Sequence, residues 1–187
     1  MLERREGLPE DYCHMADREI LRRILAMECY KKARVLFTYV SMKREVDTIN
    51  LILHALADRK TVAVPGCGAK GIMEAYHIRG MEDLKRGAYG ILEPVEGCEK
   101  ADRRDMDLAV IPCVCCSFQG LRMGYGGGYY DRYLPGCSAV RAALCRERMM
   151  VTDMPAEKHD CIMDFVITEE RVLEPGRHRT AGSRESG

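Results

Sequence analysis

A cluster of residues in the second half of the chain has the chemistry needed to bind a phosphate-bearing ligand. Arg122 can make a bidentate contact with a phosphate, and Asp131 offers the hard oxygen that a phosphate-bound magnesium ion prefers. Between them, glycine occupies four of five consecutive positions, and glycine lets the backbone approach a ligand closely. These positions are Gly124, Gly126, Gly127 and Gly128. The segment therefore predicts a site for phosphate and a divalent cation.

The surroundings of this segment favour a ligand site over a flexible turn. Glycine clustering alone is typical of a turn between a strand and a helix, and the segment matches neither the P-loop pattern nor the dinucleotide-binding fingerprint. However, a strand of the buried type precedes it, and residues 129–134 are compatible with a helix. Unpaired amides and the helix dipole both attract anions to a helix N-terminus.

The elements that must position this segment follow from the pattern of apolar residues. Continuous apolar runs predict strands covered on both faces, and residues 73–78 predict a half-buried strand. The continuous runs are residues 35–40, 61–65, 107–112, 140–144 and 165–168. Helical spacing from Asp17 to Met27 and across residues 49–56 predicts two helices.

Alternating strands and helices predict one α/β domain over residues 1–173, in which a mostly parallel sheet flanked by helices forms an open three-layer sandwich. The polar residues 174–187 predict a disordered tail. In such a fold, ligands bind beyond the carboxyl ends of the strands. The loop that contains Glu45, the turn after Pro65 and the loop after Pro112 all follow strands, so we expect them to converge.

Composition argues against several classes of partner. Lys and Arg number 29 and Asp and Glu number 29, so the formal net charge is zero and no global field attracts nucleic acid or an anionic membrane. No apolar run is long enough for a membrane span, and the N-terminus lacks the apolar core of a signal peptide. We therefore expect a cytoplasmic protein. As a separate expectation, the chain is a monomer or a weak dimer.

The chain contains ten cysteines. They are scattered and lie mostly in apolar stretches, which in a reducing compartment is typical of small buried side chains and not of a disulfide framework. Cys113, Cys115 and Cys116 form the one cluster in the sequence. A zinc site would require a second Cys or His pair at matching spacing, and none is evident, so we expect ordinary packing at a strand end.

The segment RMGYGGGYYDR at residues 122–132 resembles the most characteristic motif of the 5-formyltetrahydrofolate cyclo-ligase family, also called methenyltetrahydrofolate synthetases. Other segments resemble further motifs of this family, and they occur in the family's order. They are residues 41–48, 89–94, 107–112, 155–160 and 164–168. The resemblance covers roughly residues 17–170, and an ordered set of motifs is far more specific than one glycine-rich loop.

The resemblance implies an enzyme that converts 5-formyltetrahydrofolate to 5,10-methenyltetrahydrofolate, with ATP as co-substrate and Mg²⁺ as cofactor. The formyl oxygen is a poor leaving group, and its phosphorylation would make it a good one. Attack by the neighbouring folate nitrogen would then close the ring. The protein would align the two substrates and neutralise the phosphates.

The resemblance also implies roles for individual residues. Catalysis would involve Arg122, Tyr130 and Asp131, and Mg²⁺ would be held by Asp131 and Asp160. The reduced folate would contact Met42, Glu45, Tyr129 and Tyr130. The nucleotide would contact Arg122, Gly124, Tyr125, Gly126, Gly127, Gly128, Tyr129 and Asp131.

Structural roles compete with some of these assignments. Glu45 could be a surface residue near a helix start, where the helix dipole favours a carboxylate. Tyr129 and Tyr130 could belong to the core side of a helix. His159 could be a solvated loop residue, which is commoner for histidine than a catalytic role.

Three departures from the family pattern bear on function. The N-terminal lysine that reaches ATP in the family is missing, and Arg4 or Arg5 could replace its charge. Ser117 stands where the family has an acidic residue, and Met149 where it has a glutamine. These changes keep open a divergent, non-catalytic relative that binds nucleotide or folate. A third hypothesis is another small-molecule enzyme on this fold, such as a phosphosugar isomerase.

Overall fold

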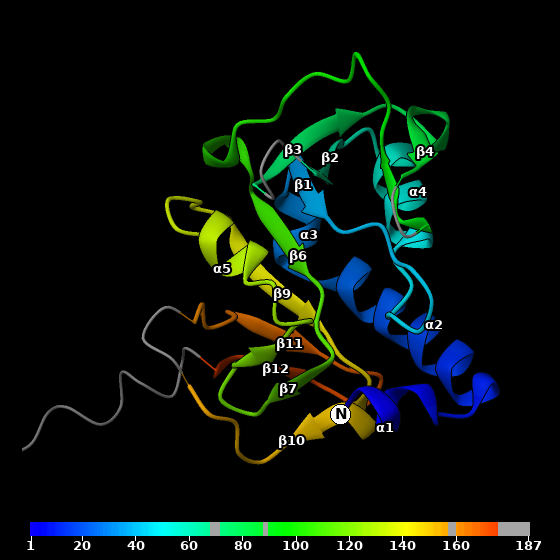
Figure 1. The fold of residues 1–187 in the computed structure, drawn as a ribbon, viewed down its shortest axis with the longest axis vertical. Coiled ribbons are helices and arrows are strands. Elements are labelled where there is room, and N and C mark those ends of the chain that lie inside the picture. The colour runs from blue at the N-terminus through cyan, green and yellow to red at the C-terminus, as the bar shows by residue number, and fades with distance from the viewer. Residues whose placement is uncertain (68–71, 88–89, 157–159, 176–187) are drawn as a thin grey trace, which may run out of the picture.

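The computed structural model describes residues 1–67, 72–87, 90–156 and 160–175, so His159 and the predicted tail beyond Pro175 lie outside the described residues. A seven-stranded sheet forms its centre, in the order β12-β11-β9-β6-β1-β2-β3 (Figure 1). Its strands are β1 Val35–Thr38, β2 Thr61–Cys67, β3 Met73–Ile78, β6 Leu108–Ile111, β9 Val140–Leu144, β11 Phe165–Ile167 and β12 Val172–Leu173.

The pairing of these strands confirms the predicted mostly parallel sheet. β1 pairs in parallel with β2 and β6, and β9 pairs in parallel with β6 and β11. The two edge strands of this sheet are antiparallel to their neighbours: β3 pairs antiparallel with β2, and β12 pairs antiparallel with β11. Since parallel strands end on the same side, the loops after β1 and β6 leave the sheet at one edge, where the sequence predicted that ligand-binding loops converge. The turn predicted after Pro65 begins later, because β2 continues to Cys67, and residues 68–71 lie outside the described part of the chain.

Helices cover both faces of the sheet. They are α1 Leu2–Glu6, α2 Glu10–Ala26, α3 Glu28–Lys32, α4 Ile49–Ala57 and α5 Tyr129–Tyr133. Successive strand side chains point to opposite faces, so Leu36 packs in the core under α2, α3 and α4, whereas Phe37 packs in the core next to α5. The predicted three layers are present, and the layer that contains α5 is thin because that helix has five residues. Within the described residues, no helix is long and apolar enough to span a bilayer.

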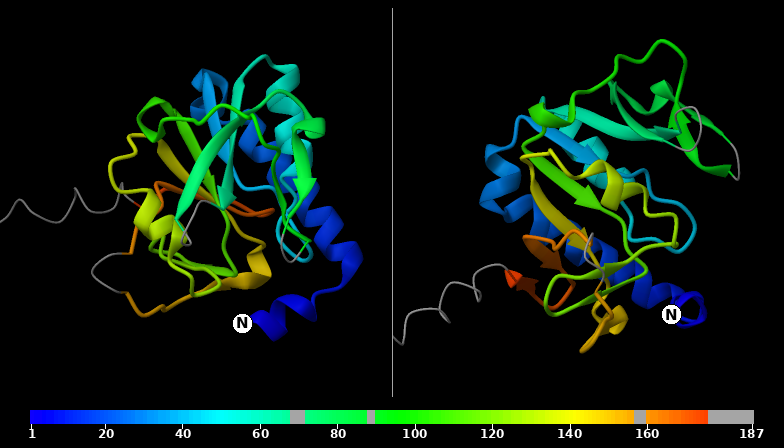
Figure 2. Two further views of the ribbon diagram at one scale, coloured as in Figure 1. Left: turned by 45° about the horizontal axis from the view of Figure 1, so that its top comes forward. Right: turned by 60° about the vertical axis from the view of Figure 1, so that its left-hand side comes forward.

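Two small sheets lie outside the central one. The first contains β7 Cys115–Ser117, β8 Arg122–Met123 and β10 Met150–Val151, and the second contains β4 Leu84–Arg86 and β5 Leu92–Pro94. In Figures 1 and 2 the first lies near α1, and the second lies at the far end of the molecule. The sequence pattern did not predict β7, β8 or β10, because strands of two or three residues carry too few side chains for a periodic signal.

The helix predicted from Asp17 begins earlier than its apolar spacing indicated. α2 begins at Glu10 and not at Asp17, with Pro9 as its N-cap residue. Glu10 and Asp11 place acidic side chains in the first turn, where the helix dipole favours them. Cys13 is among the few buried side chains in this first part of the helix, so the apolar periodicity there is weak.

Candidate functional site

The glycine-rich segment borders a cavity of about 530 Å³ beyond the carboxyl end of β6. We call residues 124–128 the glycine loop and this space the glycine-loop cavity. Its other lining residues are Pro112, Cys113, Arg122, Met123, Tyr129, Tyr130, Asp131, Met154, Pro155 and Asp160. All the residues predicted to contact nucleotide, together with both predicted magnesium ligands, therefore lie on one cavity.

The backbone of the glycine loop carries unused hydrogen-bond donors. Among the residues that the structure describes, none accepts a hydrogen bond from the backbone N–H groups of residues 124–128. Gly126 and Gly128 have φ values of 85° and 61°, in a region that residues with a side chain rarely adopt. Successive unpaired N–H groups form concave sites for anions. The expected contribution of the α5 dipole is small, because α5 has only five residues.

Arg122 and Asp131 are paired with each other. Nη2 of Arg122 donates to Oδ1 of Asp131 at 2.8 Å, and the two side chains are 4% and 19% exposed. The guanidinium also lies 5.7 Å from the centroid of the Tyr130 ring. Nε of Arg122 is buried and has no hydrogen-bond partner within the described part of the chain. A bound phosphate would therefore meet an arginine whose charge is partly neutralised by Asp131.

Asp131 and Asp160 have the chemistry that a magnesium ion requires. Both line the glycine-loop cavity, and carboxylate oxygens are preferred Mg²⁺ ligands. Oδ1 of Asp131 already accepts from Arg122 and, at 3.4 Å, from the backbone N–H of Cys161. An ion bound at Asp131 would therefore share this carboxylate with the guanidinium.

The tyrosines of this cavity differ in exposure. Tyr125 and Tyr129 are 58% and 44% exposed, and the Tyr129 ring lies 5.2 Å from the guanidinium carbon of Arg132. Tyr130 packs against the core, with its ring centroid 6.3 Å from that of Phe37. The competing core role therefore describes Tyr130, which still lines the cavity, and does not describe Tyr129.

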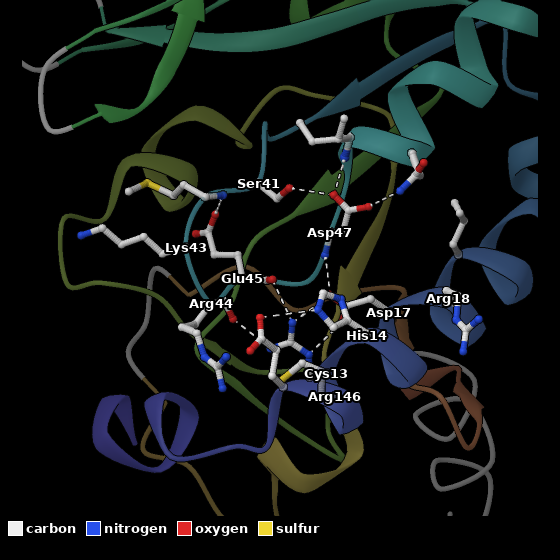
Figure 3. Close-up of a pocket in the computed structure, with 15 residues that line it drawn as sticks. Cys13, His14, Asp17, Arg18, Ser41, Lys43, Arg44, Glu45, Asp47 and Arg146 are labelled. Atoms are coloured by element: carbon white, nitrogen blue, oxygen red, sulfur yellow. Dashed lines mark hydrogen bonds and ion pairs between the residues drawn. The ribbon is translucent and has the colours of Figure 1, made fainter.

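A second cavity, of about 490 Å³, lies between α2 and the loop that follows β1 (Figure 3). We call it the α2 cavity. It is lined by Glu10, Cys13, His14, Asp17, Arg18, Leu21, Ser41, Met42, Lys43, Arg44, Glu45, Asp47, Ile49, Asn50 and Arg146. Met42 and Glu45 line the α2 cavity, whereas Tyr129 and Tyr130 line the glycine-loop cavity. The predicted folate contacts are thus divided between two cavities.

A buried ion pair holds the loop of the α2 cavity in place. The side chain of Arg146 is 4% exposed, and its Nε and Nη2 atoms donate to the two carboxylate oxygens of Asp17, each at 2.8 Å. Arg146 also donates to the carbonyl oxygens of Arg44 and Glu45 at 2.8 and 2.9 Å (Figure 3). Burial alone would lower the pKa of Arg146, but the Asp17 carboxylate outweighs it and raises this pKa.

Sequence reasoning missed both members of this pair. Asp17 and Arg146 are 129 positions apart, and neither belongs to a recognisable motif. Arg146 follows the apolar strand β9, and a charged residue there must reach either solvent or a partner. That requirement was the one available signal, and it does not identify the partner.

Glu45 interacts with residues of both cavities. Its Oε2 accepts from the backbone N–H of Met42 at 2.9 Å. Burial raises the pKa of Glu45, while the Met42 hydrogen bond, the Arg5 charge and the Tyr125 side chain act in the opposite direction. Glu45 is therefore partly buried, unlike the solvated surface residue of the competing interpretation. The backbone N–H of Ile49, at the start of α4, bonds instead to Asp47 at 3.0 Å.

Arg5 reaches the glycine loop from α1. It is 4% exposed, and its Nη2 donates to the Tyr125 hydroxyl at 2.6 Å. The guanidinium carbon lies 5.1 Å from the centroid of the Tyr125 ring. By contrast, Arg4 is exposed. Of the two arginines that could replace the missing lysine, Arg5 is the one beside the glycine loop.

Ser117 and Met149 have structural surroundings. Oγ of Ser117 accepts from the backbone N–H groups of Gln119 and Leu121 at 3.3 and 3.2 Å, which stabilises the turn between β7 and β8. Met149 is buried in the core. Neither residue lines the glycine-loop cavity or the α2 cavity. These two departures from the family pattern therefore change a turn and the core, and leave the surfaces of both cavities intact.

The fold and these cavities define an α/β protein with a composite site for small ligands at the carboxyl ends of a parallel sheet. One part of this site offers backbone N–H groups and the other offers charged side chains. A model of the 5-formyltetrahydrofolate cyclo-ligase family matches residues 1–169. The chain belongs to this family, which confirms the resemblance seen in its motifs.

Individual relatives agree with this placement. A probable 5-formyltetrahydrofolate cyclo-ligase of Schizosaccharomyces pombe is 26% identical over 171 residues, covering 82% of this chain and 84% of the relative. A mitochondrial 5-formyltetrahydrofolate cyclo-ligase of Arabidopsis thaliana is 33% identical over 185 residues, covering 84% and 67%. The solved structure of 5,10-methenyltetrahydrofolate synthetase from Aquifex aeolicus superposes with a TM-score of 0.81 at 26% identity, covering 100% of this chain and 90% of that one.

Proposed function

We propose that this chain catalyses the ATP-dependent cyclisation of 5-formyltetrahydrofolate to 5,10-methenyltetrahydrofolate, with release of ADP and phosphate. Membership of the family supports the cyclo-ligase activity. The observation that carries the ATP dependence is the glycine loop, whose five backbone N–H groups pair with no described acceptor and border a cavity of about 530 Å³. Such a surface suits the phosphates of a nucleotide.

The reaction requires the formyl oxygen to become a leaving group. In the proposed sequence this oxygen attacks the γ-phosphorus of ATP, and the bond from that phosphorus to ADP breaks. The neighbouring folate nitrogen then attacks the formyl carbon, the carbon–oxygen bond breaks, and phosphate leaves as the ring closes. Because the substrates supply the reacting groups, the protein contributes mainly alignment and charge neutralisation.

The residues of the two cavities would divide this work. The N–H groups of the glycine loop and the guanidinium of Arg122 would bind phosphate oxygens. Asp131 and Asp160 would hold Mg²⁺, which neutralises phosphate charge when bound. Glu45, fixed by its hydrogen bond to Met42, would contact the pterin or the formyl-bearing region. The exposed ring of Tyr129, which lines the glycine-loop cavity, would border the folate on the side of the nucleotide.

The contacts between the cavities support this division. Arg5 bonds to Tyr125 of the glycine loop, and its charge also acts on Glu45 of the α2 cavity. With a nucleotide on the glycine loop and a folate in the α2 cavity, the phosphoryl donor and the formyl group would therefore both lie near Arg5, Tyr125 and Glu45. The required partners are ATP and a reduced folate, without nucleic acid or membrane.

A direct assay tests the proposal. Purified protein is mixed with 5-formyltetrahydrofolate, ATP and Mg²⁺, and the near-ultraviolet absorbance of the methenyl product is followed while ADP is measured in a coupled reaction. We expect one ADP per methenyl product, and no product when ATP is omitted or Mg²⁺ is chelated. ADP release without any rise in absorbance would contradict the proposed reaction.

The divergent, non-catalytic relative is the second candidate, and the ion pair between Arg122 and Asp131 favours it. A pair that stays closed would keep both side chains from the phosphates and the metal ion. Calorimetry with ATP and with 5-formyltetrahydrofolate separates the two candidates. Binding of either ligand with no turnover would support the non-catalytic relative, and a measurable turnover number would exclude it.

A further inference from the structure

Three thiols from different parts of the chain meet beside the glycine-loop cavity. They belong to Cys113 after β6, Cys116 in β7 and Cys145 after β9, and their sulfur atoms all lie within 4.8 Å of one another. Cys116 and Cys145 are buried, whereas Cys113 is partly exposed and lines the glycine-loop cavity. The sequence showed only the cluster of Cys113, Cys115 and Cys116. In the fold, Cys115 and Cys116 are neighbours in β7 and point to opposite faces, so Cys115 lies outside the cluster. Cys145 is the third member instead.

A buried positive charge lies beside these thiols. Arg5 shares the lining of a very small cavity with Cys113 and Cys145. Nε and Nη1 of Arg5 are buried without a hydrogen-bond partner, and Arg5 makes no ion pair with any described residue. A cation next to the cluster would offset part of the charge that three thiolates carry when they bind a metal ion.

We propose that Cys113, Cys116 and Cys145 form a three-thiolate site for a thiophilic divalent cation of the Zn²⁺ type, with its fourth coordination position facing the glycine-loop cavity. Zinc–sulfur bonds of about 2.3 Å place sulfur atoms about 3.8 Å apart in a tetrahedral site. The present spacing within 4.8 Å therefore requires contraction by about 1 Å at most. Three protein ligands with one open position form a common type of zinc site.

The charges distinguish this site from a disulfide. Three thiolates and one divalent cation together carry one negative charge, and the neighbouring Arg5 carries the opposite charge. A disulfide between any two of the cysteines would be neutral and would leave the third sulfur outside the bond. The proposed site goes beyond cyclo-ligase activity and does not depend on it.

Metal titration of the full chain tests the site. Protein reduced with a phosphine and freed of metal is titrated with Zn²⁺ against a chelating indicator, and we expect one equivalent bound per chain. Substitution with Co²⁺ should produce thiolate-to-metal charge-transfer bands and the visible bands of tetrahedral coordination. Cys113→Ser, Cys116→Ser and Cys145→Ser should each weaken Zn²⁺ binding by at least about tenfold, because each removes a direct ligand.

Cys115→Ser and Cys137→Ser are the matched controls, since both cysteines are buried but lie outside the cluster. These variants should bind Zn²⁺ as the unmodified chain does. If a serine variant fails to fold, the corresponding alanine variant is used, and folding is checked by circular dichroism without metal. Zn²⁺ should raise the melting temperature of the unmodified chain and of the controls more than that of the three cluster variants at the same Zn²⁺ concentration.

Several results would overturn the proposal. These are the absence of stoichiometric Zn²⁺ binding, unchanged affinity in all three cluster variants, and an equal loss in Cys115→Ser. Alkylation of Cys113 by iodoacetamide gives an independent measurement. Saturating Zn²⁺ should slow this reaction strongly, and an unchanged rate would mean that Cys113 is a lone reactive thiolate and not a metal ligand.

Discussion

The two loops that border the cavities use their backbone in opposite ways. In the loop of the α2 cavity, the backbone N–H groups of Ser41, Met42 and Asp47 bond to the side chains of Thr48, Glu45 and Asp17, respectively. In the glycine loop, no N–H group of residues 124–128 has a described acceptor. One loop is shaped by contacts within the protein, and the other keeps its donors for a ligand.

This difference indicates that the two substrates of the proposed reaction are bound by different parts of the protein. A loop with internally satisfied amides is rigid before substrate arrives, so it presents Glu45 at little entropic cost. A loop with unsatisfied amides gains hydrogen bonds when an anion binds, and glycine at Gly126 and Gly128 permits the required positive φ. We therefore expect folate selection to depend on side chains and nucleotide binding to depend on backbone. The following predictions test this contrast.

The largest effect is expected from Asp17→Asn, which removes a contact that holds the loop of the α2 cavity in place. The substitution leaves Arg146 buried without a counter-charge, and breaking a buried pair in this way costs about 3–5 kcal/mol of unfolding free energy. Denaturant unfolding measures this loss. Hydrogen exchange should rise in residues 41–49 and stay unchanged in residues 124–128. Arg18→Gln, on the exposed side of the same helix, is the control and should change stability little. Equal exchange in both loops would refute the contrast.

The second largest effect is expected from Asp131→Asn, which removes a proposed Mg²⁺ ligand from the glycine-loop cavity. Loss of the carboxylate should reduce magnesium-dependent turnover about a hundredfold, or about 2.7 kcal/mol of transition-state stabilisation. The variant should also unfold more easily, because Arg122 loses its counter-charge. Kinetics across a range of Mg²⁺ concentrations, with the exposed Asp153→Asn as control, measure the change. Unchanged turnover would mean that Asp131 serves only as the partner of Arg122.

A smaller and more selective effect is expected from Glu45→Gln. The folate KM should rise about tenfold, the effect of losing a charged hydrogen bond worth about 1.4 kcal/mol, while ATP affinity stays nearly constant. Calorimetry with each ligand separates the two effects. Equal losses for folate and ATP would contradict the division of labour between the loops.

The same variant should have a distinctive pH dependence of stability. Burial raises the pKa of Glu45 above its usual 4.5, so the folded state holds this proton more tightly than the unfolded state. The unmodified chain therefore loses stability as pH rises from 4.5 through the raised pKa. Glu45→Gln should avoid this loss, and its advantage in melting temperature should appear above that interval and vanish below pH 4.5. The exposed Glu96→Gln should show no such dependence.

Much of the fold could be predicted because it is encoded locally. The apolar runs of β1, β6 and β9 identified buried strands, and their alternation with helices identified a parallel sheet with converging loops. The elements that escaped prediction, such as β7 and β10, have two or three residues each, and their pairing depends on chain segments distant in sequence. The start of α2 was misplaced because few apolar side chains mark its first turns.

The candidate site also contains features that are encoded locally and features that depend on distant parts of the chain. The sequence alone determined the glycine loop, its neighbours Arg122 and Asp131, and the family, because these depend on residues adjacent in the chain. Tertiary structure alone decided that Asp17 meets Arg146, that Arg5 meets Tyr125, and that Cys145 joins Cys113 and Cys116. The physical reason is that periodicity and motifs record short-range backbone preferences. Contacts between distant side chains arise only once strand order and register bring their elements together.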